Sequence, residues 1–376
     1  MGPSGGGLLL VGSLAEGPHA PCALLLDVRT RGVRRELELP DGATRVLSVA
    51  LSPCGEAAAA GLDDGFVVWD AGSGAQRLRV CGGQSGADAG HRGEVTGVGF
   101  SPCGTRLVTA GGDDRRVVIW DLASGAPAAP LLGHAARVRT AVFSPDGAHV
   151  ASGGDDMAVR VWDAASGALE RTLEDVDSET AHAVAFAADD GRVATAGTDD
   201  VCKVWDAENV YSSVEGHDAS VLALAFSPDG AALAVPRPPR HRRPHRARVR
   251  PPPLQLRRGV RRGALTRGAQ TAGADAAVRL WNRAGEPVLW LATHAQGPHM
   301  LGCRCREADG APHPECPPVP GHAGAVRALA YSGEAHIFAT GGDDGAARVW
   351  DGARGELLVA LDAGFPIGAL AFVRGS

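Results

Sequence analysis

Short stretches of alternating apolar and polar residues recur along the chain, and each ends at a turn signal. The clearest copies are VLSVALSPCG from Val46, VTGVGFSPCG from Val95, VRTAVFSPDG from Val138, VLALAFSPDG from Val221 and VRALAYSGE from Val326. A weaker copy, HAVAFAADDG, begins at His182. A period of two is typical of a strand with one buried face. In the turns, proline fixes φ and glycine supplies a positive φ. These stretches therefore predict the first strand of a repeated unit.

Each first strand is followed at a regular distance by an apolar segment that ends in tryptophan and an acid or amide. These segments are GFVVWD, RVVIWD, AVRVWD, VCKVWD, AVRLWN and AARVWD, and they place the tryptophans at Trp69, Trp120, Trp162, Trp205, Trp281 and Trp350. Further apolar stretches such as RLVTAGG lie before the tryptophan segment, and stretches such as GELLVALD lie after it. Four short antiparallel strands in about 42 residues make one propeller blade.

On these motifs the chain resembles the WD-repeat β-propeller family. The resemblance covers nearly all of residues 1–376 except 236–270 and about 295–320. It implies an all-β fold, a single propeller domain built from four-stranded antiparallel blades.

The resemblance also implies a buried network in each blade that joins a histidine, a hydroxyl, an aspartate and the tryptophan. We expect two complete sets, His134, Ser152, Asp156 and Trp162, and His322, Thr340, Asp344 and Trp350. A third set, His217, Thr271, Asp275 and Trp281, is complete only if residues 236–270 are bridged. A fourth set has His91, Asp114 and Trp120, with Ala110 in the hydroxyl position. Buried polar groups need partners, so we interpret these residues as scaffold and not as catalytic groups.

The two ends of the chain together supply one more unit. FPIGALAFVRG at 365–375 reads as a first strand with nothing after it. GLLLVGS at 7–13, CALLLDV at 22–28 and RRELELP at 34–40 read as second, third and fourth strands with no first strand. We therefore expect seven blades, the last closed by one C-terminal and three N-terminal strands, which would remove exposed sheet edges.

Residues 236–270 do not fit the repeat. They contain 12 arginines and no acidic residue, and they lengthen the spacing from Phe226 to Trp281 to 55 residues. We expect this segment to interrupt a second strand between Val235 and Thr271 and to be disordered, since it has few apolar residues. Three interpretations are open: a translated intron or shifted reading frame, an unstructured linker, or a basic arm that binds RNA or DNA. No aromatic residue is interleaved for base stacking.

Charge and motif content bear on the function class. The net charge is −6, so the chain outside the arginine-rich segment carries −18, which argues against nonspecific nucleic-acid binding by its general surface. There is no phosphate-binding loop, nucleophile elbow or HExxH motif, and no run long enough to span a membrane. We expect a non-enzymatic intracellular protein, cytoplasmic or nuclear, without a cofactor.

A weak zinc candidate lies in the long connection at 295–320. Its potential ligands are Cys303, Cys305, His313 and Cys316. The first pair is spaced more tightly than is usual for zinc, so we expect unligated thiols and no metal.

The family resemblance implies a scaffold or adaptor that binds proteins or peptides in a multiprotein complex. The alternatives are a ubiquitin-ligase substrate receptor, although no repeat ends in Trp-Asp-x-Arg, and an RNA-associated propeller that uses the 236–270 arm. The expected partner-binding residues lie in the Asp-rich turns and at the starts of first strands: Arg137, Arg139, Asp113, Asp155, Arg327 and Asp343.

Overall fold

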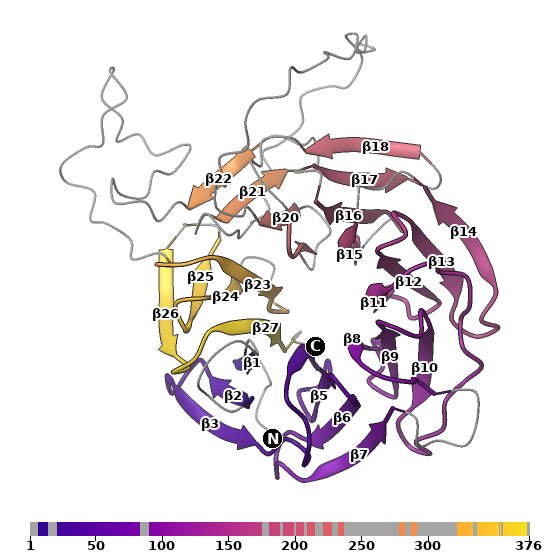
Figure 1. The fold of residues 1–376 in the computed structure, drawn as a ribbon. Helices are drawn as coiled ribbons and strands as arrows, with labels where there is room; N and C mark the ends of the chain where they lie inside the picture. Colours follow the sequence, from indigo (N-terminus) through magenta and orange to yellow (C-terminus); the bar gives the residue numbers. More distant parts are fainter. Residues whose placement is uncertain are drawn as a thin grey trace, which may run out of the picture.

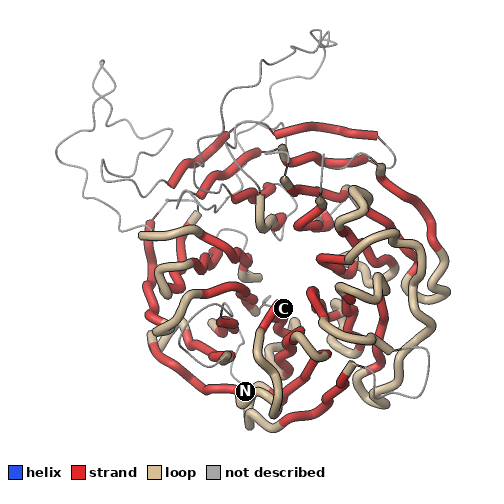
Figure 2. Tube along the Cα trace, viewed as in Figure 1, coloured by secondary structure: helices blue, strands red, loops and turns tan. Residues whose placement is uncertain are grey.

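The computed structural model describes residues 7–13, 21–82, 90–174, 180–188, 191–198, 201–206, 209–214, 221–227, 232–236, 278–282, 287–291, 322–333, 337–352, 354 and 356–373. The regular elements of this part are all strands, arranged in small sheets around a central opening (Figures 1 and 2). The fold is therefore an all-β propeller. None of the described segments is a helix long and apolar enough to cross a bilayer.

Five of the sheets each contain four consecutive antiparallel strands. The first consists of β4 (Val46–Leu51), β5 (Ala57–Leu62), β6 (Gly65–Asp70) and β7 (Gln76–Cys81). The next two consist of β11 (Val138–Phe143), β12 (His149–Gly154), β13 (Val159–Asp163) and β14 (Leu169–Leu173), and of β15 (Ala181–Phe186), β16 (Val193–Gly197), β17 (Cys202–Asp206) and β18 (Asn209–Val214). The last two consist of β19 (Ala225–Phe226), β20 (Ala232–Pro236), β21 (Val278–Asn282) and β22 (Pro287–Leu291), and of β23 (Val326–Tyr331), β24 (Ile337–Gly342), β25 (Ala346–Asp351) and β26 (Glu356–Asp362).

A sixth sheet has three strands instead of four. It contains β8 (Val95–Phe100), β9 (Arg106–Gly111) and β10 (Val117–Asp121). Where a fourth strand was expected, the chain makes only isolated bridges from Val117 to Leu131 and from Trp120 to Pro127. Pro127 and Pro130 have no amide hydrogen to donate to a ladder. The four-strand prediction was therefore wrong for this unit.

The remaining sheet joins the two ends of the described chain. Its strand order is β27 (Ile367–Phe372), β1 (Leu8–Ser13), β2 (Ala23–Asp27) and β3 (Gly32–Leu37). β27 runs antiparallel to β1, with Leu9 opposite Phe372 and Val11 opposite Leu370. Figure 1 shows β27 on the side of this sheet that faces the central opening.

Apolar side chains of neighbouring sheets pack against one another to form the core. Phe66 of β6 and Trp120 of β10 are both buried, and their ring centroids lie 4.9 Å apart. Sheets come close where side chains are small. At Gly61 a Cβ atom would lie 2.4 Å from the carbonyl oxygen of Val95, so no larger residue fits without moving one backbone. Burial of large apolar side chains stabilises such a core by about 1.5–3 kcal/mol each.

The arginine-rich segment begins at the end of β20, the second strand of its sheet. β20 is continuous to Pro236, and its register pairs Leu233 with Trp281 and Pro236 with Val278 of β21. β20 thus extends one residue past the predicted break after Val235, and the predicted resumption of the strand at Thr271 lies outside the described residues. An insertion at the connection between strands removes no bond of the ladder, and connections are where insertions are usually tolerated. Residues 237–277 themselves, and the 295–320 connection, lie outside the described part of the chain.

Candidate functional site

A chain of hydrogen bonds runs through the sheet of β11–β14 from a tryptophan to an aspartate. Trp162 Nε1 donates to Ser152 Oγ at 2.9 Å, Ser152 Oγ lies 2.8 Å from His134 Nε2, and His134 Nδ1 lies 3.0 Å from Asp156 Oδ1. An indole nitrogen can only donate, so the serine oxygen accepts. A proton on His134 Nδ1 would be donated to Asp156, and Nε2 would then accept from the serine hydroxyl. Arg160 Nη1 also lies 2.9 Å from His134 Nδ1.

The sheet of β23–β26 repeats the same arrangement. Trp350 Nε1 lies 2.9 Å from Thr340 Oγ1, Thr340 Oγ1 lies 2.7 Å from His322 Nε2, and His322 Nδ1 lies 2.8 Å from Asp344 Oδ1. The hydroxyl and the imidazole are almost completely buried in both sheets. A buried polar group without a partner would destabilise the fold by about 1–3 kcal/mol, and this chain provides each group with one.

The three-stranded sheet contains the network too, with a hydroxyl that the sequence analysis missed. Thr109 Oγ1 lies 2.7 Å from Trp120 Nε1 and 2.7 Å from His91 Nε2, and His91 Nδ1 lies 2.9 Å from Asp114 Oδ2. The assignment of Ala110 to the hydroxyl position was wrong by one residue. This unit has one more residue between the hydroxyl and the tryptophan, 11 positions in place of 10. The spacing from histidine to hydroxyl is 18 in both units and would have identified Thr109.

The other units differ from this pattern. Trp205 Nε1 donates to Thr195 Oγ1 at 2.8 Å. Trp69 Nε1 instead donates to the backbone carbonyl of Glu38 at 3.0 Å, and Asp63 accepts from the backbone amide of Thr44 at 3.1 Å. The expected network residues His217, Thr271 and Asp275 lie outside the described residues, and Trp281 lies in β21 without a described side chain.

The network aspartates are held as carboxylates. Burial raises the pKa of Asp156, but hydrogen bonds from His134, the Ala135 amide and Arg160 outweigh burial and hold that pKa well below its usual range. The same balance lowers the pKa of Asp344. Burial lowers the pKa of His322, although Asp344 opposes that shift. The His322 imidazole is therefore neutral at neutral pH.

A serine, a histidine and an aspartate in contact raise the question of nucleophilic catalysis. Ser152 has 0% of its surface exposed, and its oxygen already accepts the indole hydrogen of Trp162. A nucleophile must reach a substrate and pass its proton to the adjacent base. A fully buried hydroxyl cannot meet a substrate, so the arrangement acts as a structural network.

The three arginines among the predicted partner-binding residues line the central opening, and the structure pairs each with one of the predicted aspartates. Arg139 Nε and Nη2 lie 2.6 and 3.0 Å from the two carboxylate oxygens of Asp155. Arg327 makes the equivalent two-point contact with Asp343, where Nη2 and Oδ2 are 3.1 Å apart. In both pairs the arginine is the second residue of a first strand and the aspartate follows 16 residues later.

Arg137 belongs to the same region but connects two sheets. Its Nη1 lies 3.4 Å from Asp113 Oδ1, and its Nη2 contacts Glu94. Asp113 and Glu94 flank strands of the three-stranded sheet, whereas Arg137 precedes β11. All six predicted residues are therefore engaged in ion pairs, and their contact with a partner stays a prediction.

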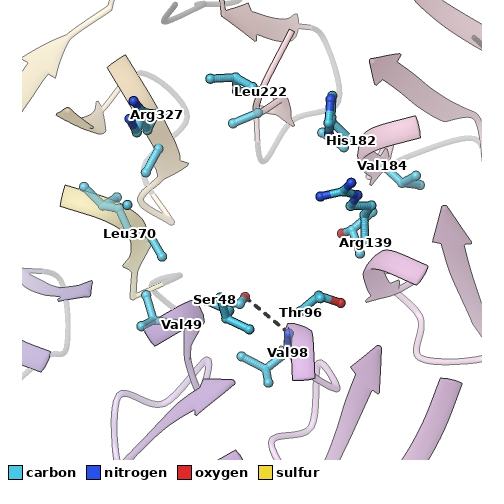
Figure 3. Close-up of a pocket in the computed structure, with 18 of the residues that line it drawn as sticks. Ser48, Val49, Thr96, Val98, Arg139, His182, Val184, Leu222, Arg327 and Leu370 are labelled. Carbon is cyan, nitrogen blue, oxygen red and sulfur yellow. Dashed lines mark hydrogen bonds between the residues drawn. The ribbon is translucent and has the colours of Figure 1, made fainter. Parts of the chain in front are cut away.

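A cavity of about 450 Å³ occupies this end of the central opening (Figure 3). Arg137, Arg139 and Arg327 line it together with two residues that the sequence analysis missed, Arg45 and His182. Two strand positions supply these cations. The second residue of a first strand is His182, Arg139 or Arg327. The residue just before a first strand is Arg45 at β4 and Arg137 at β11. Because Arg45 and His182 occupy the same strand positions as Arg137 and Arg139, an alignment of the first strands could have identified both residues.

Toward the other end of the same first strands lies a second cavity, of about 470 Å³. It is lined by aromatic side chains: Phe100, Phe143, Phe186, Phe226, Tyr331 and Phe372. The opening thus has one end lined by cationic side chains and another lined by aromatic ones.

No group of metal-binding side chains was found in the described part of the chain. The weak zinc candidate, Cys303, Cys305, His313 and Cys316, lies outside that part and stays a prediction.

Comparison with known proteins agrees with the repeats. The family model of the WD domain, G-beta repeat, matches residues 84–121, 125–163, 170–206, 208–235 and 315–351. An uncharacterized WD repeat-containing protein of Synechocystis sp. is 41% identical over 58 residues, which is 15% of this chain and 17% of that protein. The match thus spans less than a fifth of the length of that relative. With repeated WD motifs, matching repeat models and a ring of small antiparallel sheets, this chain is a member of the WD-repeat β-propeller family.

Proposed function

We propose that this protein is a non-enzymatic scaffold that binds other proteins or peptides within a multiprotein complex, in the cytoplasm or the nucleus. WD-repeat propellers commonly act in this way, and the family membership supports the same role here. The observation that carries the proposal is the cavity at the central opening. It gathers side chains from segments far apart in the sequence, including Arg45, Arg139, His182 and Arg327.

We also propose that the propeller is a closed ring of seven blades, the last of which is completed by β27. The pairing of β27 with β1 supports this closure, as do the seven sheets of the described chain. Closure matters for binding because it fixes the first strands relative to one another. A ligand that contacts several strands then loses less entropy on binding than it would on a flexible surface.

The buried networks favour a support over an enzyme. Their histidines and hydroxyls are the residue types that catalysis commonly uses, yet they are committed to one another inside the sheets. The described cavities are not lined by Ser152, Thr340 or Thr109. The groups that do reach the central cavity are suited to recognition by charge and hydrogen bonding.

The experiment that tests this function is purification of the full-length protein from its own cells after mild cross-linking, followed by reconstitution with each enriched protein. We expect at least one partner to form a stoichiometric complex that survives size-exclusion chromatography. A chain that remains monomeric with every enriched protein would contradict the scaffold function. A hydrolase screen with and without divalent metals is the companion test, and activity there would contradict the non-enzymatic assignment.

A further inference from the structure

We propose that the cationic end of the central opening binds the carboxylate groups of an acidic peptide segment, and that Arg139 and Arg327 hold it. This inference rests on the proposed protein-binding function and names the chemistry of the partner. It concerns a set of side chains that only the ring brings together, because Arg139 and Arg327 are separated by nearly half of the chain.

The cavity differs in charge from the rest of the protein. Four arginines and one histidine are among its 24 lining residues, and no aspartate or glutamate is. The chain outside the arginine-rich segment carries a net charge of −18, whereas the side chains that line this cavity include cations and no acids. The carboxylates that pair with Arg137, Arg139 and Arg327 lie outside that lining. Recognition of a carboxylate ligand therefore depends on the guanidinium donors that these ion pairs leave over.

The carboxylates that pair with these arginines hold the guanidinium groups in place. Asp155 engages Nε and Nη2 of Arg139, which leaves Nη1 outside the pair. Asp343 engages the same two atoms of Arg327. Both arginine side chains keep 37% of their surface exposed. A guanidinium fixed from one side presents its remaining donors in a set direction, and a preorganised fork loses little entropy when it meets a carboxylate.

The position of Arg139 fits this role. Figure 3 shows its guanidinium directed into the opening, beside His182. Between the cationic groups the wall is mixed: Val49, Leu222 and Leu370 supply apolar side chains, and Ser48 and Thr96 supply hydroxyl groups in the same view. Glutamate matches such a wall because its methylene stem packs on apolar carbon while its carboxylate reaches the arginine donors.

The same features argue against a nucleic acid as the ligand. No aromatic side chain lines this cavity, so bases have nothing to stack on there. A polynucleotide also carries a charge on every residue, and most of its phosphates would lie against the acidic remainder of the protein. A peptide needs to place only two or three carboxylates inside the cavity.

The test is fluorescence polarisation with the full-length protein and three labelled probes: octaglutamate, octaglutamine and octathymidylate. Wild-type protein is compared with an Arg139→Ala/Arg327→Ala variant and with Arg77→Ala. Arg77 is a matched control because it also pairs with an aspartate, Asp70, but on the outer strand β7 and away from the cavity. Thermal unfolding of each variant checks that it is folded.

We expect wild-type protein to bind octaglutamate at least about tenfold more tightly than octaglutamine, since a charge-assisted hydrogen bond contributes about a factor of ten or more. The double variant should lose at least about tenfold in octaglutamate affinity, and Arg77→Ala should change it by less than about twofold. If the double alanine variant is unfolded, Arg139→Lys/Arg327→Lys keeps the charge without the fork and should show an intermediate loss.

Three results would overturn the inference: equal binding of octaglutamate and octaglutamine, a folded double variant that binds octaglutamate like wild type, or tighter binding of octathymidylate than of octaglutamate. A partner from the reconstitution that binds the double variant unchanged would also overturn it while leaving the scaffold function intact. The absence of any partner for either protein would contradict the scaffold function instead.

Discussion

The indole nitrogen of Trp120 lies 2.7 Å from the hydroxyl oxygen of Thr109, deep between two sheets of the ring. The same oxygen lies 2.7 Å from His91, which in turn contacts Asp114. One hydroxyl therefore satisfies a buried donor and a buried imidazole at once. This relationship recurs at Ser152 and Thr340, and it makes the hydroxyl the residue on which each network depends.

Replacement of Thr109 by valine should therefore destabilise the propeller. Valine has the same shape, so the change removes the hydroxyl and leaves Trp120 Nε1 and His91 Nε2 without this partner in a buried site, while His91 Nδ1 keeps Asp114. We expect a loss of about 1–3 kcal/mol in the free energy of unfolding, measured by urea denaturation. Thr172→Val in the outer strand β14 is the control, because this side chain is only partly buried. Equal effects of the two substitutions would contradict the role of Thr109.

His322 should make stability depend on pH. Burial lowers the pKa of this imidazole in the folded protein, whereas the unfolded chain has the ordinary value of about 6.5. Below about pH 6.5 the unfolded chain therefore binds a proton that the folded chain does not, and unfolding becomes more favourable as pH falls. The stability that depends on a neutral His322 is therefore fully present above about pH 6.5 and is lost as the pH falls below it.

The measurement is the free energy of unfolding from about pH 7 to pH 5 for wild-type protein and for His322→Gln. We expect the wild-type curve to fall more steeply with decreasing pH than the curve of the variant. His149→Gln is the control, because His149 is partly exposed and lies near Glu170. The free energy of unfolding of this variant should fall with decreasing pH as steeply as that of the wild-type protein. A steeper fall in His322→Gln than in wild type would show that the sign is wrong.

Removal of residues 237–270 should leave the propeller folded. The segment follows the end of β20, and residues 271–277 would still connect β20 to β21. Loop length affects closure entropy only weakly, so we expect a change of no more than about 1 kcal/mol, measured by thermal unfolding. A loss of the cooperative transition would contradict placement of the segment outside the ladder.

The same deletion tests the basic-arm hypothesis for the 237–270 segment. If this segment binds RNA through six or more phosphates, the logarithm of the affinity falls with the logarithm of salt concentration with a slope of about −4 or steeper. We expect RNA affinity to be weak and its salt dependence shallow, and both to be unchanged by the deletion. A steep slope that disappears on deletion would support the arm instead.

Much of the fold could be predicted from the sequence because each blade repeats the same pattern of residues. The alternation before each Ser-Pro turn and the tryptophan segment after it correspond to strands such as β11 and β13, and their spacing located His134, Ser152 and Asp156. Prediction was less successful where a unit departs from the common length. One additional residue moved the hydroxyl from the expected Ala110 to Thr109, and the prolines at 127 and 130 replaced a fourth strand with bridges.

The cationic cavity was harder to predict, for a physical reason. Arg45, His182 and Arg327 are distant in the sequence and meet only because their strands lie around one opening. Charge at the starts of first strands pointed to Arg139 and Arg327, but the 16-residue pairing with Asp155 and Asp343 depends on the turn geometry of the blade. Aligning the second residue of each first strand would have brought His182 into the set.

Hydrogen–deuterium exchange tests the central claim, that β27 closes the ring by pairing with β1. It is measured on the full chain and on a chain that lacks residues 365–376. In the full chain the amides of 8–13 and 367–372 should be protected to a similar extent. In the shortened chain, protection should fall at 8–13 and persist at 138–173. Unchanged protection at 8–13 would contradict closure through β27, and with it the rigid ring on which the proposed function depends.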